Sequence, residues 1–121
     1  MTKIFPTTME GLAACQAFLS SVCESPRPQI IMDEVASNIV RCSGAADFSV
    51  DVKVEDGVMT LVFTDAGRPF DPTAVAEPDV KAPAESRPVG GLGLFMVRKL
   101  SKSVSYRREG GQNVLTVVMS A

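Results

Sequence analysis

Apolar residues recur at helical spacing in two segments of the N-terminal half of the chain. Within residues 9–22 they fall three and four positions apart, and the Ser-Pro-Arg-Pro stretch at 25–28 interrupts the pattern. A second run of the same period begins near Pro28 and continues to Cys42, where a Ser-Gly pair follows. The pattern predicts two amphipathic helices, each with one apolar stripe packed against a core.

Alternation of apolar and polar residues replaces the helical period in the next part of the chain. Residues 48–54 and 58–63 alternate on either side of an Asp-Gly pair, which is a strong hairpin signal. Residues 3–6 fit a short edge strand, because a proline is tolerated at the edge or the end of a strand.

The C-terminal part of the chain has the same order of a helix followed by a hairpin. A helical run over residues 92–101 precedes two predicted strands, 103–108 and 113–119, which meet at a Gly-Gly turn. Helices segregated from antiparallel hairpins predict an α+β fold, here a two-layer α/β sandwich.

A long segment without periodicity separates the two parts. Residues 65–88 contain five of the eight prolines. We expect a long loop there, with one short helix near residues 73–76, and we expect residues 70–90 to act as a lid.

Length and composition indicate one ordinary globular domain over residues 1–121. The chain is 45% hydrophobic and 21% charged with a net charge of −2, so no basic excess is available for direct binding to nucleic acid. It has no signal-like N-terminus and no membrane span, which predicts a cytoplasmic protein. The three cysteines lack metal-ligand spacing and the chain has no histidine, so we expect reduced, mostly buried thiols.

A polar ridge borders the apolar stripe of the second predicted helix. Projection at about 100° per residue places Glu34, Asn38 and Arg41 along it. The amide oxygen of Asn38 suits Mg²⁺, the carboxylate of Glu34 suits a proton acceptor, and Arg41 suits a phosphate. A solvated helix margin explains the same three residues, so the ridge alone does not decide between these interpretations.

Two further motifs in the sequence have chemistry that suits a nucleotide. Asp65 at a strand end can accept a hydrogen bond from an adenine amino group. Gly67 has no side chain, so a ring can approach the backbone beside Asp65. The glycine cluster at residues 90–93 enters a helix, where free N–H groups and the positive helix end favour phosphate. An ordinary turn and a tightly packed helix start are the alternative interpretations. The cluster has neither the Walker spacing nor a preceding strand.

Three motifs follow one another along the chain: Glu34-x-x-x-Asn38, then Asp-x-Gly-x-Pro-Phe-Asp-Pro at 65–72, then Gly-Leu-Gly-Leu-Phe-Met-Val at 91–97. In this order they resemble the motifs of the histidine-kinase-like ATPase superfamily. The similarity covers about residues 8–119 and is strongest to the small anti-sigma-factor serine kinases. The resemblance implies the Bergerat ATP-binding fold, with helices on one face of a mixed, mostly antiparallel sheet, and it implies ATP and Mg²⁺ as ligands.

The resemblance also implies roles for individual residues. Glu34 matches the general base and Asn38 the magnesium ligand, while Asp65 matches the aspartate that reads adenine. Arg87 is a candidate for the γ-phosphate, and Thr116 is a candidate for the adenine pocket through water. The remaining matches are to ATP-binding positions: Arg41, Gly67, Gly91, Leu92, Gly93 and Leu94. The chain departs from the family at residues 41–43, Arg-Cys-Ser, where such kinases commonly have His-Gly or His-Ala.

The resemblance favours a serine protein kinase that sequesters a sigma factor and phosphorylates an antagonist (anti-anti-sigma) protein, and it implies a homodimer. The main alternative is a non-catalytic module of the same fold, in which ATP only gates protein binding. A detached sensor-kinase catalytic domain is disfavoured, because the chain has no histidine and no coiled-coil pattern.

Overall fold

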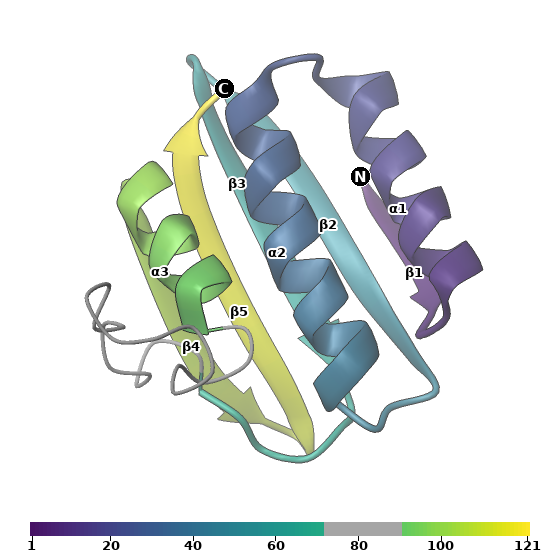
Figure 1. The fold of residues 1–121 in the computed structure, drawn as a ribbon. Coiled ribbons are helices and arrows are strands. Elements are labelled where there is room, and N and C mark those ends of the chain that lie inside the picture. Colours follow the sequence, from purple (N-terminus) through teal and green to yellow (C-terminus); the bar gives the residue numbers. More distant parts are fainter. Residues whose placement is uncertain (72–90) are drawn as a thin grey trace.

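The computed structural model describes residues 1–71 and 91–121 (Figure 1). Arg87, the expected short helix near 73–76 and most of the expected lid lie outside the described residues. Each of the other predicted helices and strands is present. In chain order they are β1 (Thr2–Pro6), α1 (Met9–Val22), α2 (Pro26–Cys42), β2 (Asp47–Glu55), β3 (Val58–Asp65), α3 (Gly91–Leu100), β4 (Ser103–Glu109) and β5 (Gln112–Ser120).

Both N-terminal helices begin at residues whose chemistry suits a helix start. The Thr8 hydroxyl accepts a hydrogen bond from the Gly11 N–H at 3.0 Å, which caps α1. Helix α2 begins at Pro26, two residues before the predicted start, and Pro28 lies in the same first turn. Proline is tolerated there because the first helical N–H groups have no partner within the helix. The Pro-Arg-Pro stretch is thus the beginning of α2, and it is not a linker.

The five strands form one sheet in the order β1-β2-β3-β5-β4. The three helices cover one face of it, so the predicted two-layer α+β sandwich is confirmed (Figure 1). Every pair of described strands is antiparallel, whereas the resemblance implied a mixed sheet. In the β3–β5 pair, Asp65 lies opposite Asn113, so the end of β3 and the start of β5 meet at one end of the sheet.

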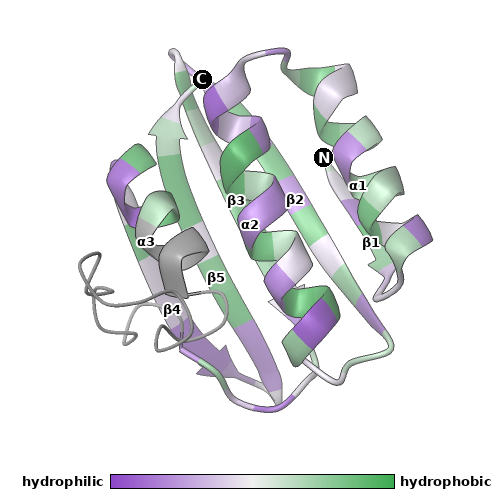
Figure 2. Cartoon of the chain, viewed as in Figure 1, coloured by the Kyte–Doolittle hydropathy of each residue, from purple (hydrophilic) through white to green (hydrophobic). Residues whose placement is uncertain are grey.

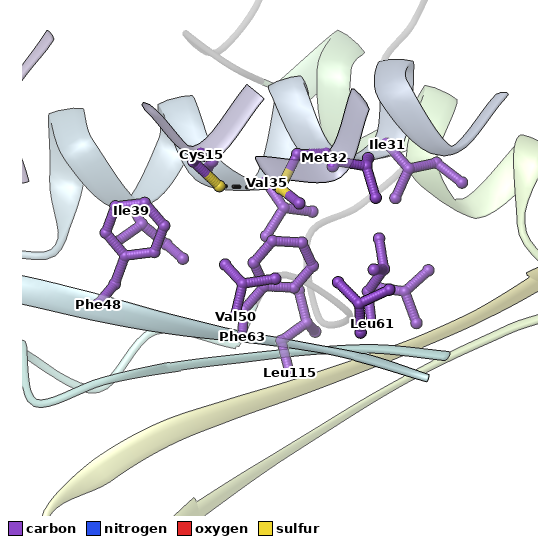
Figure 3. Packing of buried hydrophobic residues seen from close by; sticks show 14 of the residues in the cluster. Cys15, Ile31, Met32, Val35, Ile39, Phe48, Val50, Leu61, Phe63 and Leu115 are labelled. Atoms are coloured by element: carbon purple, nitrogen blue, oxygen red, sulfur yellow. Dashed lines mark hydrogen bonds between the residues drawn. The ribbon is translucent and has the colours of Figure 1, made fainter. Parts of the chain in front are cut away.

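The core lies between the sheet and the helices, as the alternation predicts (Figure 3). Figure 2 shows hydrophilic and hydrophobic residues alternating along α2. The buried residues of its apolar stripe, among them Ile31, Val35 and Ile39, belong to the core cluster. Met32 on α2 meets α1 through its sulfur, which lies 3.1 Å from Sγ of Cys15. The largest fully buried side chains of this core are Leu19, Ile31, Met32, Phe48, Met59, Leu61, Phe63 and Met119.

The described cysteines are free thiols, with Cys15 buried and Cys23 and Cys42 partly buried. Burial raises the pKa of the Cys15 thiol to about 12, and the nearby charge of Asp33 adds to the effect. This thiol stays protonated at neutral pH and packs as a small hydrophobic group. None of the described helices is long and apolar enough to cross a membrane.

Candidate functional site

A crevice opens between the C-terminal half of α2 and the adjoining ends of β3 and β5. It holds about 470 Å³ of empty space, including the part open to solvent. Apolar side chains from the core form much of its lining, and a few polar groups converge on it, which is the composition expected of a small-molecule site. Its lining residues are Val35, Asn38, Ile39, Cys42, Ser43, Phe63, Asp65, Arg68, Phe70, Tyr106, Asn113 and Leu115.

Asp65 is the buried carboxylate of this crevice, with 7% of its surface exposed. Its Oδ1 accepts two hydrogen bonds, from the Gly67 N–H at 2.9 Å and from Nδ2 of Asn113 at 3.1 Å. Both bonds fall on the same oxygen, and among the described residues Oδ2 has no partner. Oδ2 is therefore the acceptor that Asp65 can offer to a ligand, as an adenine-reading aspartate requires.

Gly67 lies where no side chain fits. A Cβ there would overlap the carbonyl oxygen of Ser43 and would lie 2.8 Å from Oδ1 of Asp65. The backbone of the next residue continues this close approach, since the Arg68 N–H donates to the same Ser43 carbonyl at 3.0 Å. The packing of the loop against the end of α2 explains this glycine, and its contact with a nucleotide stays a prediction.

The structure separates the three residues of the predicted polar ridge on α2. Asn38 lines the crevice, whereas Glu34 is half-buried one turn earlier and is not among the lining residues. Arg41 is exposed, and its Nε donates to the Ser37 carbonyl at 3.3 Å. After Asn38 the lining residues on α2 are Ile39 and Cys42, so the expected place of Arg41 in the site is not seen.

Among the described residues, Arg68 is the arginine that lines the crevice, and the sequence analysis did not single it out. Its Nε donates to the Cys42 carbonyl at 2.8 Å, which places a positive charge at the C-terminal end of α2. It lies inside the Asp-x-Gly-x-Pro stretch, at a variable position between Gly67 and Pro69. Its proximity to Asp65 in the sequence is the signal that could have found it.

Asn113 is the second missed residue, and it takes the place expected for Thr116. Thr116 lies three residues further along β5 and pairs with Val62. Because side chains alternate along a strand, Asn113 and Thr116 point to opposite faces, and Thr116 is not among the lining residues. The expected contact of Thr116 with the pocket is therefore not seen, and Asn113 binds Asp65 directly.

Helix α3 begins at Gly91, so Gly91, Leu92, Gly93 and Leu94 form its first turn, as predicted for the start of this helix. Figure 1 shows this N-terminal end at the same end of the molecule as the C-terminus of α2. The positive end of the α3 dipole thus lies at the end of the sheet where β3 finishes. Contact of these residues with phosphate stays a prediction.

The described residues contain no group of three or more His, Cys, Asp or Glu side chains that could hold a metal ion by themselves. Mg²⁺ rarely needs such a cage, because it keeps several waters and binds nucleotides through phosphate oxygens with one or two protein oxygens. A single amide oxygen from Asn38 in the crevice fits that mode of binding.

The fold is that of an ATPase domain. The profile of the histidine kinase-like ATPase domain matches residues 6–119, so the chain belongs to this family, and the family implies that it binds ATP. The histidine kinase AdeS of Acinetobacter baumannii has a similar structure, with a TM-score of 0.57 at 14% identity. That match covers 99% of this chain and 67% of the AdeS chain in the solved structure, and at this identity it shows the shared fold alone. No curated protein matches the chain.

Proposed function

We propose that this chain is an ATP- and Mg²⁺-dependent serine protein kinase that holds a sigma factor inactive and phosphorylates its antagonist protein. The observation that carries the proposal is the meeting of Asn38 from α2 and Asp65 from β3 in one crevice. Glu34 lies one turn from Asn38 on the same helix and is only half-buried, which suits a base that must meet a second protein.

Each residue has a distinct task in this proposal. Oδ2 of Asp65 accepts a hydrogen bond from the exocyclic amino group of adenine. Asn38 provides a neutral oxygen for the metal, which would neutralise charge on the phosphate oxygens when bound. Glu34 accepts the proton of the target serine hydroxyl as that oxygen attacks the γ-phosphorus, the bond from this phosphorus to the β–γ bridging oxygen breaks, and ADP leaves.

The second candidate is a non-catalytic module in which ATP binding gates the capture of a partner. The observation that favours it is the position of Glu34, which is not among the residues that line the crevice. A carboxylate outside the crevice can contact a partner without ever meeting the phosphate.

Phosphate transfer from labelled ATP to the cognate antagonist separates the two candidates. We expect transfer to serine by the wild type and a loss of about 100-fold or more for Glu34→Gln, because a positioned base contributes about that much. Glu24→Gln makes the same change at an exposed residue before α2 and should transfer normally. Calorimetry should give all three proteins similar ATP affinity.

Two results would contradict the kinase proposal. Full ATP-dependent capture of the partner without any transfer by the wild type would establish the non-catalytic module. Normal transfer by Glu34→Gln would remove Glu34 from the reaction.

A further inference from the structure

Asn113 makes four hydrogen bonds within the protein, which satisfies its side-chain amide. Its Nδ2 donates to Oδ1 of Asp65 at 3.1 Å and to the Arg68 carbonyl at 2.8 Å. Its Oδ1 accepts from the Tyr106 hydroxyl at 2.6 Å and from the Phe70 N–H at 3.3 Å. Both N–H donors and both acceptor positions of the amide are thus used, although Asn113 lines a crevice open to solvent.

These contacts allow only one orientation of the amide. A flipped Asn113 would turn its oxygen toward Oδ1 of Asp65 and toward the Arg68 carbonyl, and both of these groups only accept. It would also turn its NH₂ group toward the Phe70 N–H, which only donates. The donor side of Asn113 therefore faces Asp65 in every low-energy arrangement of this cluster.

The fixed amide determines what Asp65 can offer to a ligand. Oδ1 is occupied by Gly67 and Asn113, and the two bonds prevent rotation of the carboxylate. Among the described residues Oδ2 has no partner, so it is the acceptor that Asp65 can offer, and neither N–H of Asn113 remains available as a donor. A 6-amino purine can donate to this oxygen, whereas the 6-oxo group of a hypoxanthine or guanine base would meet it acceptor to acceptor.

We propose that Asn113 is a positioning residue that sets the base preference of the nucleotide site by holding Asp65 in this orientation, with Tyr106 as its support. The inference rests on the proposed binding of ATP at this crevice. Asn113 on β5 connects two other strands and a loop, since Asp65 ends β3, Tyr106 lies on β4, and Phe70 lies in the segment after β3. Loss of its amide would release the carboxylate without removing it.

The test is the ratio of dissociation constants for inosine triphosphate and ATP, measured by calorimetry on the full chain without any partner protein. The two nucleotides share ribose and phosphates and differ only at the Watson–Crick edge of the base. We expect the wild type to prefer ATP by about tenfold or more, because the wrong base leaves two acceptors facing each other. Asn113→Leu, which is similar in size but has no polar atoms, should bring the ratio close to one.

Two further variants complete the test. Gln112→Leu makes the same kind of change at the exposed neighbouring residue and should keep the wild-type ratio. Tyr106→Phe removes only the hydroxyl that supports Asn113, so it should lower the ratio about threefold. It is also the milder change, so it decides the question if Asn113→Leu does not fold.

The possible failures are distinguishable. If Asn113 has only a structural role, Asn113→Leu and Tyr106→Phe should weaken the binding of both nucleotides equally and leave the ratio of dissociation constants unchanged. That result would overturn the inference and keep the ATP site. A wild type that binds ATP without any preference over inosine triphosphate would also overturn the inference alone. A wild type that binds neither nucleotide would overturn the proposed function as well.

Discussion

At the scale of single residues, Gly67 shows how closely the loop after β3 approaches the end of α2. The Ser43 carbonyl occupies the space that a Cβ would need, and it also accepts the Arg68 N–H. Neither backbone group can move away without breaking that hydrogen bond. The glycine therefore sets the position of Asp65 as well as the path of the loop.

Gly67→Ala should lower the free energy of unfolding by about 1–3 kcal/mol, the usual cost of forcing atoms into a packed site. It should also weaken ATP binding, because the loop must shift and Asp65 shifts with it. Urea unfolding and calorimetry measure the two effects. Ala66→Ser, at the exposed neighbouring residue, should change neither quantity. A stability loss below about 0.5 kcal/mol would show that the loop yields easily.

The buried thiol of Cys15 should make the free energy of unfolding depend on pH in the alkaline range. Its pKa is raised from 9.0 to about 12 in the folded protein, first by burial and second by the charge of Asp33. Between these values the unfolded thiol loses its proton while the folded thiol keeps it, so stability is complete below about pH 9 and falls above it. The expected slope is about 1.4 kcal/mol per pH unit for one proton.

The measurement is urea unfolding of the wild type and Cys15→Ala at several values between pH 8 and pH 11. Cys15→Ala should be less stable at pH 8, because it leaves a small cavity. Its stability should then fall with pH less steeply than that of the wild type, by the contribution of one proton. Parallel curves for the two proteins would show that the buried thiol does not contribute.

At the scale of elements, α1 depends on a side-chain cap at its start. The Thr8 hydroxyl accepts the Gly11 N–H, one of the four N–H groups that a helix leaves unpaired at its N-terminus. Thr8→Ala should lower the free energy of unfolding by about 1 kcal/mol, measured by urea unfolding. Thr8→Ser keeps the hydroxyl, so its free energy of unfolding should fall much less. Equal losses for the two variants would indicate that the methyl group of Thr8, and not the cap, stabilises the helix.

Sequence periodicity predicted the elements better than it predicted their contacts. The 3.6-residue period located α1 and α2, and the Asp-Gly pair located the β2–β3 hairpin, because local chemistry decides those features. The start of α2 was placed two residues late because Pro26 reads equally well as a linker and as a first helical turn. The order of motifs gave the family, and Asn38 and Asp65 both line the crevice.

Asn113 could not be predicted, because its place in the crevice depends on a contact between distant segments. Asn113 faces Asp65 only because β5 lies next to β3 in one particular register, and no local pattern specifies that register. Thr116 lies on the opposite face of β5 in this register, and its contact with a nucleotide stays a prediction. A register one residue away would have exchanged the two faces of β5.

At the scale of the whole molecule, the sheet order gathers the site at one end. The strand order places β3 between β2 and β5, so that the end of β3 lies under the C-terminal half of α2. Helix α3 begins at the same end (Figure 1). A ligand there would contact segments from both halves of the chain, so its binding free energy should appear as stability of the complete domain.

ATP at 100 times its dissociation constant should therefore stabilise the fold by about 2.7 kcal/mol, seen as a rise in Tm of several degrees. In the wild type the rise should be larger with Mg²⁺ than with EDTA, because Asn38 provides a ligand for the metal. Asn38→Ala should show the same smaller rise under both conditions. Ser37→Ala is the matched control, since the Ser37 hydroxyl donates within α2 to the Glu34 carbonyl at 3.3 Å, and it should respond to Mg²⁺ as the wild type does. A full magnesium response in Asn38→Ala would place the metal on other residues while leaving the adenine end of the crevice intact.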